Sequence, residues 1–227
     1  MATPQQLLLS LADAPAPTLQ NFVTGGNGAV LAALHGFGDD AAARSLYLWG
    51  GHGSGRSHLL KAWAAARGAV HVDARTSPDL AGVESGPALA VDNCEALNDA
   101  GQIALFNLFN QARASDSPAY LLISGPLPPP QLKLRDDLQS RLAWGLSLEV
   151  AALTDAEKLA ALQAHAQARG MRLADEVAAY MLTHVRRDMP TLMRIVEALD
   201  LASLTAKRPV TLPLLRELLN ETTSLPL

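Results

Sequence analysis

The feature that most constrains this chain is a glycine-rich stretch, GGHGSGRS, which fits the pattern G-x4-G-[K/R]-S. It directly follows an apolar run, Leu46–Trp49, and directly precedes a helical pattern that extends to about Arg67. Glycines let successive backbone N–H groups turn inward, and the positive end of the following helix faces the same point. The stretch therefore predicts a phosphate-binding loop made of Gly50, Gly51, His52, Gly53, Ser54, Gly55, Arg56 and Ser57, with His58 in the next turn.

Short apolar runs alternate with helical patterns between about residue 44 and residue 150. Helical patterns extend over about residues 57–67 and 98–114. Such alternation predicts an α/β domain with a five-stranded parallel sheet covered on both faces, here over residues 18–152. The strand candidates are Leu46–Trp49, Ala69–Asp73, Ala88–Asp92, Ala119–Ser124 and Leu146–Val150.

The two ends of the chain have different patterns from the middle. From residue 153 to residue 227 the strand pattern stops, and Thr154 to Glu157 form a capping box followed by helical spacing of apolar residues. These residues predict a small all-α domain. Residues 1–17 contain Pro15 and Pro17 among small residues, so we expect a flexible tail.

Composition narrows the class of protein. Lys and Arg number 18 and Asp and Glu number 22, so the net charge is −4, which disfavours DNA as the main partner because DNA binding relies on a basic face. The single cysteine, Cys94, suits a reducing cytoplasm. No basic segment precedes Leu7–Leu9 and no apolar run reaches the roughly 18 residues of a membrane span, so we expect neither a signal peptide nor a membrane anchor.

A second acidic element follows the loop. The apolar strand Ala88–Asp92 ends in a carboxylate, which in such domains holds Mg²⁺ together with a hydroxyl of the loop, so Asp92 and Ser57 are the predicted metal ligands and ATP or ADP the cofactor. Arg56 stands where the loop usually has lysine, and Asn93 stands where related ATPases have a second carboxylate. Because an amide cannot take a proton from water, we expect nucleotide binding with slow or absent intrinsic hydrolysis.

Three segments resemble the DnaA family of bacterial replication initiators, which are AAA+ proteins. Ser140–Leu146 resembles the segment with that family's arginine finger, Leu19–Val23 resembles its adenine-pocket entrance, and Leu48–Leu60 resembles its phosphate loop and first helix. The resemblance covers about residues 18–220 and implies an AAA+ P-loop domain followed by an all-α lid domain. It also implies that Arg141 is an arginine finger acting in trans and that Asn21, Phe22, Val23 and Ser124 contact the nucleotide.

Arg56, Asn93 and the short tail resemble more closely the Hda family of DnaA-homologous regulatory inactivators. That family's tail has a motif, Q-L-x-L-x-L, that binds the sliding clamp, and residues 6–11 match it, with Gln6, Leu7, Leu9 and Leu11 as contacts. The resemblance implies a cytoplasmic protein that is held on the DNA-loaded clamp, the β subunit of DNA polymerase III. It further implies that the protein stimulates hydrolysis of DnaA-bound ATP, prevents re-initiation, holds ADP and contacts DNA only indirectly.

Two positions depart from the DnaA pattern. Pro126 replaces an acidic residue after the sensor 1 strand, and Pro190 replaces the sensor 2 arginine, with Arg186, Arg187 and Arg194 as open substitutes. Leu142 and Trp144 are expected to pack the Arg141 helix on the core.

Three alternatives remain open at this stage. The first is an autonomous AAA+ ATPase that loads or remodels other proteins during DNA replication. The second is a DNA-binding regulator, which the lack of a helix-turn-helix pattern after about residue 220 disfavours. The third concerns assembly, because a homodimer would cover Arg141.

Overall fold

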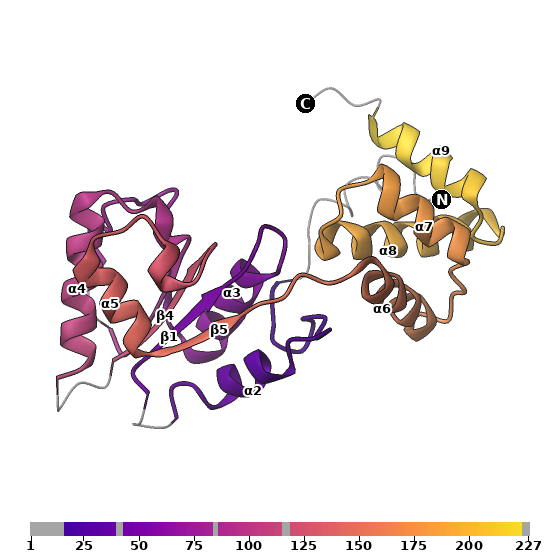
Figure 1. Cartoon of the computed structure of the whole chain (residues 1–227). Helices are drawn as coiled ribbons and strands as arrows, with labels where there is room; N and C mark the ends of the chain where they lie inside the picture. Colours follow the sequence, from indigo (N-terminus) through magenta and orange to yellow (C-terminus); the bar gives the residue numbers. More distant parts are fainter. Residues whose placement is uncertain (1–15, 40–42, 84–85, 115–118, 224–227) are drawn as a thin grey trace. The chain divides into compact units, whose positions relative to one another are not determined.

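The computed structural model describes residues 16–39, 43–83, 86–114 and 119–223 (Figure 1). Two compact units are present, an α/β unit of residues 16–152 and a helical unit that begins at residue 153. The tail residues Gln6, Leu7, Leu9 and Leu11 lie outside the described residues. Among the residues that are described, no helix combines the length and the apolar character needed to span a membrane.

The α/β unit is built on one parallel sheet. Its strands are β1 (Ser45–Trp49), β2 (Val70–Asp73), β3 (Ala88–Asp92), β4 (Tyr120–Gly125) and β5 (Leu146–Glu149), in the order β2-β3-β4-β1-β5. Every neighbouring pair is parallel, which confirms the predicted five-stranded parallel sheet. All five residues of β3 are buried, as expected for a central strand covered on both faces. The carboxyl ends of β1, β3 and β4 therefore meet at one edge, where ligands bind in such sheets.

Helices cover both faces of the sheet (Figure 1). The helices of this unit are α2 (Gly28–Gly36), α3 (Arg56–Arg67), α4 (Asp99–Ala112) and α5 (Asp136–Trp144), with short 3-10 turns η1 (Cys94–Ala96) and η2 (Pro129–Gln131). Leu46 and Leu48 of β1 lie in the same core cluster as side chains of α2 and α3. Tyr47, between them, lies in the cluster of α4 and α5. Because successive strand residues point to opposite faces, α3 and α5 cover opposite faces of the sheet.

The helical unit consists of α6 (Asp155–Ala168), α7 (Asp175–His184), α8 (Met189–Ala206) and α9 (Leu212–Thr223). The predicted capping box at α6 is confirmed: the Thr154 N–H donates to the Glu157 carboxylate over 2.7 Å, and the Glu157 N–H donates to the Thr154 hydroxyl over 3.2 Å. Pro190 lies in the first turn of α8, where a proline costs little because the N–H groups of that turn have no helical partner. One apolar core, which includes Leu162, Val177, Met181, Leu192, Leu199 and Leu215, joins the four helices.

Candidate nucleotide-binding site

The loop after β1 begins with Gly50, and any larger residue at this position would displace neighbouring atoms. A Cβ atom on Gly50 would lie 2.3 Å from the Val150 carbonyl oxygen and 3.0 Å from the Ser54 hydroxyl. The Val150 N–H donates to the Trp49 carbonyl over 2.6 Å, which holds the chain after β5 directly beside this loop. The loop therefore begins as a tightly packed turn at the carboxyl end of β1.

A second glycine forms the junction between the loop and α3. Gly55 has a φ of +98° and is the N-cap of α3, and a Cβ atom there would lie 2.7 Å from the Phe22 ring. Glycine adopts this left-handed conformation without the steric cost that other residues incur. The glycine thus lets Phe22 approach the first turn of α3, where backbone N–H groups favour an anion.

Two polar groups in the loop are buried without a partner. The Ser54 hydroxyl and one terminal nitrogen of the Arg56 guanidinium, Nη1, have no hydrogen-bond partner among the described residues. Arg56 is only 8% exposed. Buried polar groups are nearly always hydrogen-bonded, and an unmet donor costs free energy. These two unmet groups favour a polar ligand at the loop. The remaining loop residues, Gly51, His52, Gly53 and Ser57, are exposed.

His58, one turn into α3, packs against the segment that precedes α2. Its ring centroid lies 5.6 Å from that of Phe22, and its Nε2 is 2.9 Å from the Thr18 carbonyl oxygen. Burial lowers the pKa of His58, an effect that the Thr18 carbonyl partly offsets. His58 therefore holds Phe22 and its neighbours on α3.

The carboxylate predicted to hold metal lies at the end of β3. Asp92 is 1% exposed and accepts a hydrogen bond from the Ser124 hydroxyl at the end of β4. The Ser124 hydroxyl oxygen in turn accepts the Asn93 N–H over 3.2 Å. Ser124 thus orients Asp92, and the structure brings the two predicted residues into contact.

Asn93, the residue after Asp92, has a left-handed backbone and contacts Asp73. Its φ is +58°, and its side-chain amide donates to an Asp73 carboxylate oxygen over 2.9 Å. Burial acts to raise the pKa of Asp73, but the Arg75 N–H and the Asn93 amide outweigh it, so the pKa lies below its usual value. The residue after Asp92 is therefore an amide whose side chain is hydrogen-bonded to Asp73.

Two residues of β2 lie at this edge of the sheet and were not predicted from the sequence to belong to the site. Asp73 aligns with Asp92 across the β2–β3 pair, and the His71 Nε2 atom lies 4.0 Å from an Asp92 carboxylate oxygen. Burial lowers the pKa of His71, although Asp92 opposes that shift. Asp73 ends an apolar strand just as Asp92 does, and that shared pattern was the available signal.

The residues of the segment predicted to form the adenine pocket make different kinds of contact. The Asn21 side chain accepts the Thr18 N–H over 2.9 Å and donates to the Ala16 carbonyl over 3.0 Å, so it stabilises a local turn. Phe22 reaches the loop, and Val23 is half-buried beside it. Asn27, which is 2% exposed, exchanges two hydrogen bonds with the Ala151 backbone, of 3.0 and 2.8 Å. Asn27 thus fastens this segment to the chain after β5.

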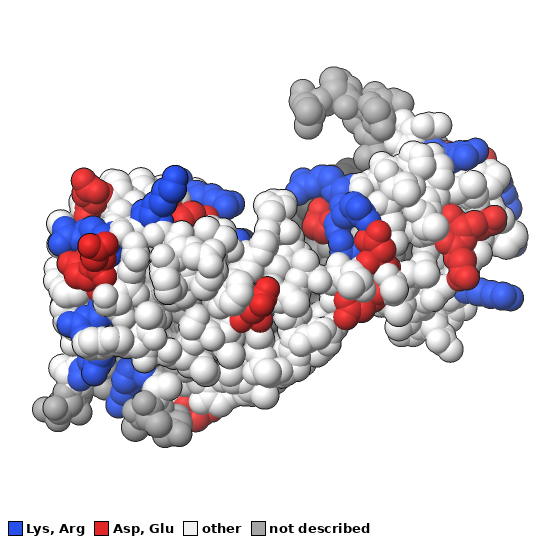
Figure 2. All heavy atoms as spheres, viewed as in Figure 1, with Lys and Arg blue, Asp and Glu red and all other residues white. Residues whose placement is uncertain are grey.

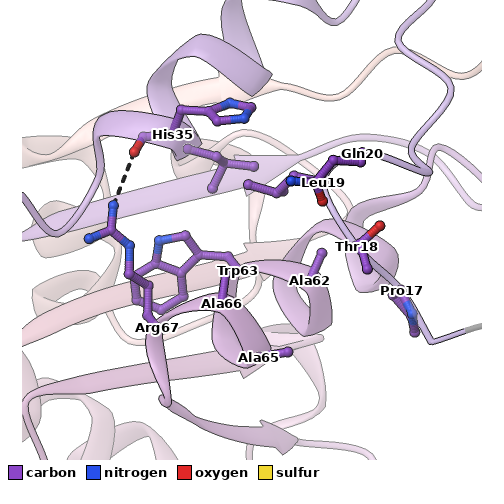
Figure 3. A pocket seen from close by; sticks show the side chains of 11 residues that line it. Pro17, Thr18, Leu19, Gln20, His35, Ala62, Trp63, Ala65, Ala66 and Arg67 are labelled. Carbon is purple, nitrogen blue, oxygen red and sulfur yellow. Dashed lines mark hydrogen bonds between the residues drawn. The ribbon is translucent and has the colours of Figure 1, made fainter.

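A pocket of about 400 Å³ lies beside the second half of α3 (Figure 3). Its wall includes Leu19, Trp63 and Arg67, and the Arg67 guanidinium donates to the His35 carbonyl over 3.0 Å and pairs with Asp39. This pocket is at the opposite end of α3 from Gly55. Because its one arginine already has partners, we do not assign it to the phosphates.

Arg141 lies away from the loop, on the face of the sheet that α5 covers. Its guanidinium carbon is 4.4 Å from the Trp144 ring centroid and 5.4 Å from that of Phe106. Leu142 packs in the core as predicted, but the prediction for Trp144 was wrong, because that side chain is 63% exposed. Two residues along a helix correspond to about 200° of rotation, so Trp144 points away from the face that Leu142 buries.

The helical unit and the whole fold are similar to known proteins. Residues 155–219 match the family model described as the lid domain of Hda. The fold resembles domain III of the replication initiation protein DnaA from Thermotoga maritima, with a TM-score of 0.67 and 20% identity over 93% of this chain and 98% of that chain. AMPPCP-bound DnaA from Aquifex aeolicus gives a TM-score of 0.63 and 21% identity over 84% and 67% of the two chains.

A RuvB variant from Thermotoga maritima is similar as well, with a TM-score of 0.62 and 16% identity over 92% of this chain and 73% of that chain. At these identities the likeness shows the fold. The chain therefore has the fold of DnaA domain III and RuvB, and its helical unit matches the family model of the Hda lid domain.

Proposed function

We propose that this chain is a regulatory AAA+ protein that stimulates hydrolysis of DnaA-bound ATP and so prevents re-initiation of replication. The observation that carries this proposal is an Hda-type lid, residues 155–219, behind a domain with the fold of DnaA domain III. In the proposed complex the tail holds the chain on the DNA-loaded sliding clamp, and Arg141 acts on the ATP of DnaA. The site of action is the cytoplasm, and contact with DNA is indirect.

The chain's own nucleotide is proposed to be ADP, bound by residues 50–57. The partnerless Ser54 hydroxyl and Arg56 Nη1 suit the phosphates, and Phe22 adjoins the first turn of α3. Ser57 and Asp92 suit Mg²⁺, because hydroxyl and carboxylate oxygens are its preferred ligands. When bound, Mg²⁺ neutralises phosphate charge. The DnaA structure from Aquifex aeolicus holds the ATP analogue AMPPCP, which supports an adenine nucleotide here.

Intrinsic hydrolysis is expected to be slow because the position after Asp92, where related ATPases have a second carboxylate, is an amide, Asn93. The Asn93 amide is committed to Asp73, and Arg56 replaces the compact charge of lysine with a broad planar fork. We expect the purified chain with ATP and Mg²⁺ to turn over more slowly than about 1 s⁻¹, the low end for competent phosphoryl-transfer enzymes.

The same assay tests the proposed function when DnaA and DNA-loaded clamp are added. Hydrolysis of DnaA-bound ATP should then accelerate, and the acceleration should require both the chain and the clamp. Fast hydrolysis by the chain alone, independent of DnaA, would favour the alternative of an autonomous loader or remodeller.

The tail motif gives a separate prediction. Replacing Gln6, Leu9 and Leu11 together by Ala should abolish clamp binding, because the leucines are proposed to fill an apolar groove. The matched control is Leu8→Ala with Ser10→Ala, which changes only the variable positions of the motif. Surface plasmon resonance on immobilised clamp measures both affinities. Equal affinity of the two variants would show that the motif does not bind the clamp.

A further inference from the structure

A pocket of about 480 Å³ opens beside Arg141, and neither the phosphate loop nor the lid contributes to it. Three arginines and an exposed tryptophan make this pocket basic, with one aromatic wall. In Figure 2 basic side chains lie at the lower left of the α/β unit, where α4 and α5 end in Figure 1. The pocket is lined by Ala43, Arg44, Ser45, Phe109, Arg113, Arg141, Trp144, Gly145 and Leu146.

The fold brings these residues together from three elements. Arg141 and Trp144 are three residues apart on α5 and so share one side of the helix. Arg113 is the C-cap of α4, and Arg44 directly precedes β1. A Cβ atom on Gly145 would lie 2.5 Å from the Ser45 hydroxyl, so the end of α5 packs closely on the start of β1. The close packing places the end of α5, which includes Trp144, beside the residue that follows Arg44.

The three guanidinium groups form a positive cluster. Within residues 16–39, 43–83, 86–114 and 119–223, no carboxylate makes an ion pair with Arg44, Arg113 or Arg141. The guanidinium carbons of Arg113 and Arg141 lie 4.9 and 4.4 Å from the same Trp144 ring centroid. The ring attracts both cations, while the cations repel each other. An anion between them would relieve that repulsion.

We propose that this pocket receives the polyphosphate of a nucleotide bound to a partner protein, with Arg113 as a second phosphate-contacting cation and Trp144 as the positioning residue for Arg141. The proposal deepens the proposed function and rests on it for the identity of the partner, DnaA. A planar guanidinium group can donate two parallel hydrogen bonds to the oxygens of one phosphate. Two guanidinium groups can therefore contact two phosphates of the same nucleotide. Trp144 limits the orientations of the Arg141 side chain before the partner docks.

The first experiment separates docking from transition-state stabilisation. Single-turnover hydrolysis of DnaA-bound ATP is measured on loaded clamp at increasing concentrations of the full chain. Arg113→Ala should lower the maximal rate by about 10-fold, a typical loss for a charge-assisted contact, with little change in the half-saturating concentration. Trp144→Leu should lower the maximal rate by about 3-fold, and Trp144→Phe, which keeps a ring, should recover most of it.

The matched control is Arg135→Ala, at the other end of α5, which removes the same charge from an arginine paired with Asp137 at the surface. It should leave both kinetic parameters unchanged. An Arg113→Ala variant that behaves like this control would overturn the proposal. The proposal would also be overturned if Arg113→Ala raised the half-saturating concentration and left the maximal rate normal, because Arg113 would then contribute to docking alone.

The second experiment does not depend on DnaA. Inorganic tripolyphosphate is titrated into the isolated chain, which has three tryptophans, and the response of Trp144 is the difference between the wild-type and Trp144→Phe emission changes. We expect Trp144 to respond, and the response to vanish in the Arg113→Ala, Arg141→Ala double variant. No response, or a response to single-stranded oligonucleotide in place of tripolyphosphate, overturns the pocket assignment. A normal response without stimulation of DnaA leaves the pocket standing and refutes the proposed function.

Discussion

Replacing Arg141 by Ala is expected to reduce stimulated hydrolysis of DnaA-bound ATP by about 10³- to 10⁵-fold, the usual contribution of an arginine finger supplied in trans. The reason is electrostatic: the guanidinium stabilises charge that develops on the transferred phosphoryl group. The substitution should not unfold the chain, because Leu138 and Leu142 anchor α5 in the core while Arg141 lies on the adjacent side. The measurement is single-turnover hydrolysis with saturating chain and loaded clamp.

Two controls test whether the loss in Arg141→Ala is specific to hydrolysis. Clamp affinity should be unchanged in Arg141→Ala, since the proposed clamp motif lies at residues 6–11. Arg135→Ala, on the same helix, should stimulate DnaA as the wild type does. Stimulation that survives Arg141→Ala within about 10-fold would remove Arg141 from the reaction, because a loss that small lies well below the range expected for a finger.

Replacing Gly50 by Ala is expected to destabilise the α/β unit and to abolish most nucleotide binding. The added methyl group would lie 2.3 Å from the Val150 carbonyl oxygen. The Val150 N–H donates to the Trp49 carbonyl and so holds the Val150 backbone in place, which means that the loop itself must move. Overpacking of this kind costs about 1–3 kcal/mol in the free energy of unfolding. A displaced loop also loses the alignment of its N–H groups, and we expect ADP affinity to fall by at least about 10-fold, the equivalent of a single lost charge-assisted contact.

Gly36→Ala, outside the loop, is the matched control for this variant. Gly36 is the last residue of α2, and a Cβ atom there meets nothing within 4 Å, so the same chemical change should leave stability and affinity almost unaltered. Urea unfolding gives the free energy of unfolding, and titration with a fluorescent ADP analogue gives the affinity. If Gly50→Ala binds ADP as tightly as Gly36→Ala does, the loop does not form the nucleotide site.

The elements that could be predicted from sequence are those whose pattern is local. The strand Ala88–Asp92 has the bounds that the sequence predicted, because four consecutive apolar residues followed by an acidic residue are typical of a covered strand in such a sheet. The capping box at Thr154 and Glu157 needs only four residues and appears as expected. Helix α2 was not predicted, since it is short, begins and ends with glycine, and has apolar residues on several sides.

The site residues that were missed or misplaced depend on contacts between distant segments. Trp144 looked like a core residue because it is large and apolar, but only the placement of Leu138 and Leu142 decides which side of α5 is buried. The contact of Asn27 with the Ala151 backbone could not be predicted, because the two residues are 124 positions apart in the sequence. The commitment of Asn93 to Asp73 depends on the pairing of β2 with β3 and on a left-handed backbone.

Local sequence patterns were enough to predict the glycine-rich loop between strand and helix, the parallel sheet and the all-α C-terminal unit, because periodicity and backbone freedom are properties of neighbouring residues. Three contacts of the folded chain could not be predicted in this way. Gly50 packs on Val150, Ser124 orients Asp92, and Arg113 and Arg141 both contact the exposed Trp144 ring. These contacts join residues from separate strands and helices. Their geometry follows from strand order and helix packing, which no local pattern specifies.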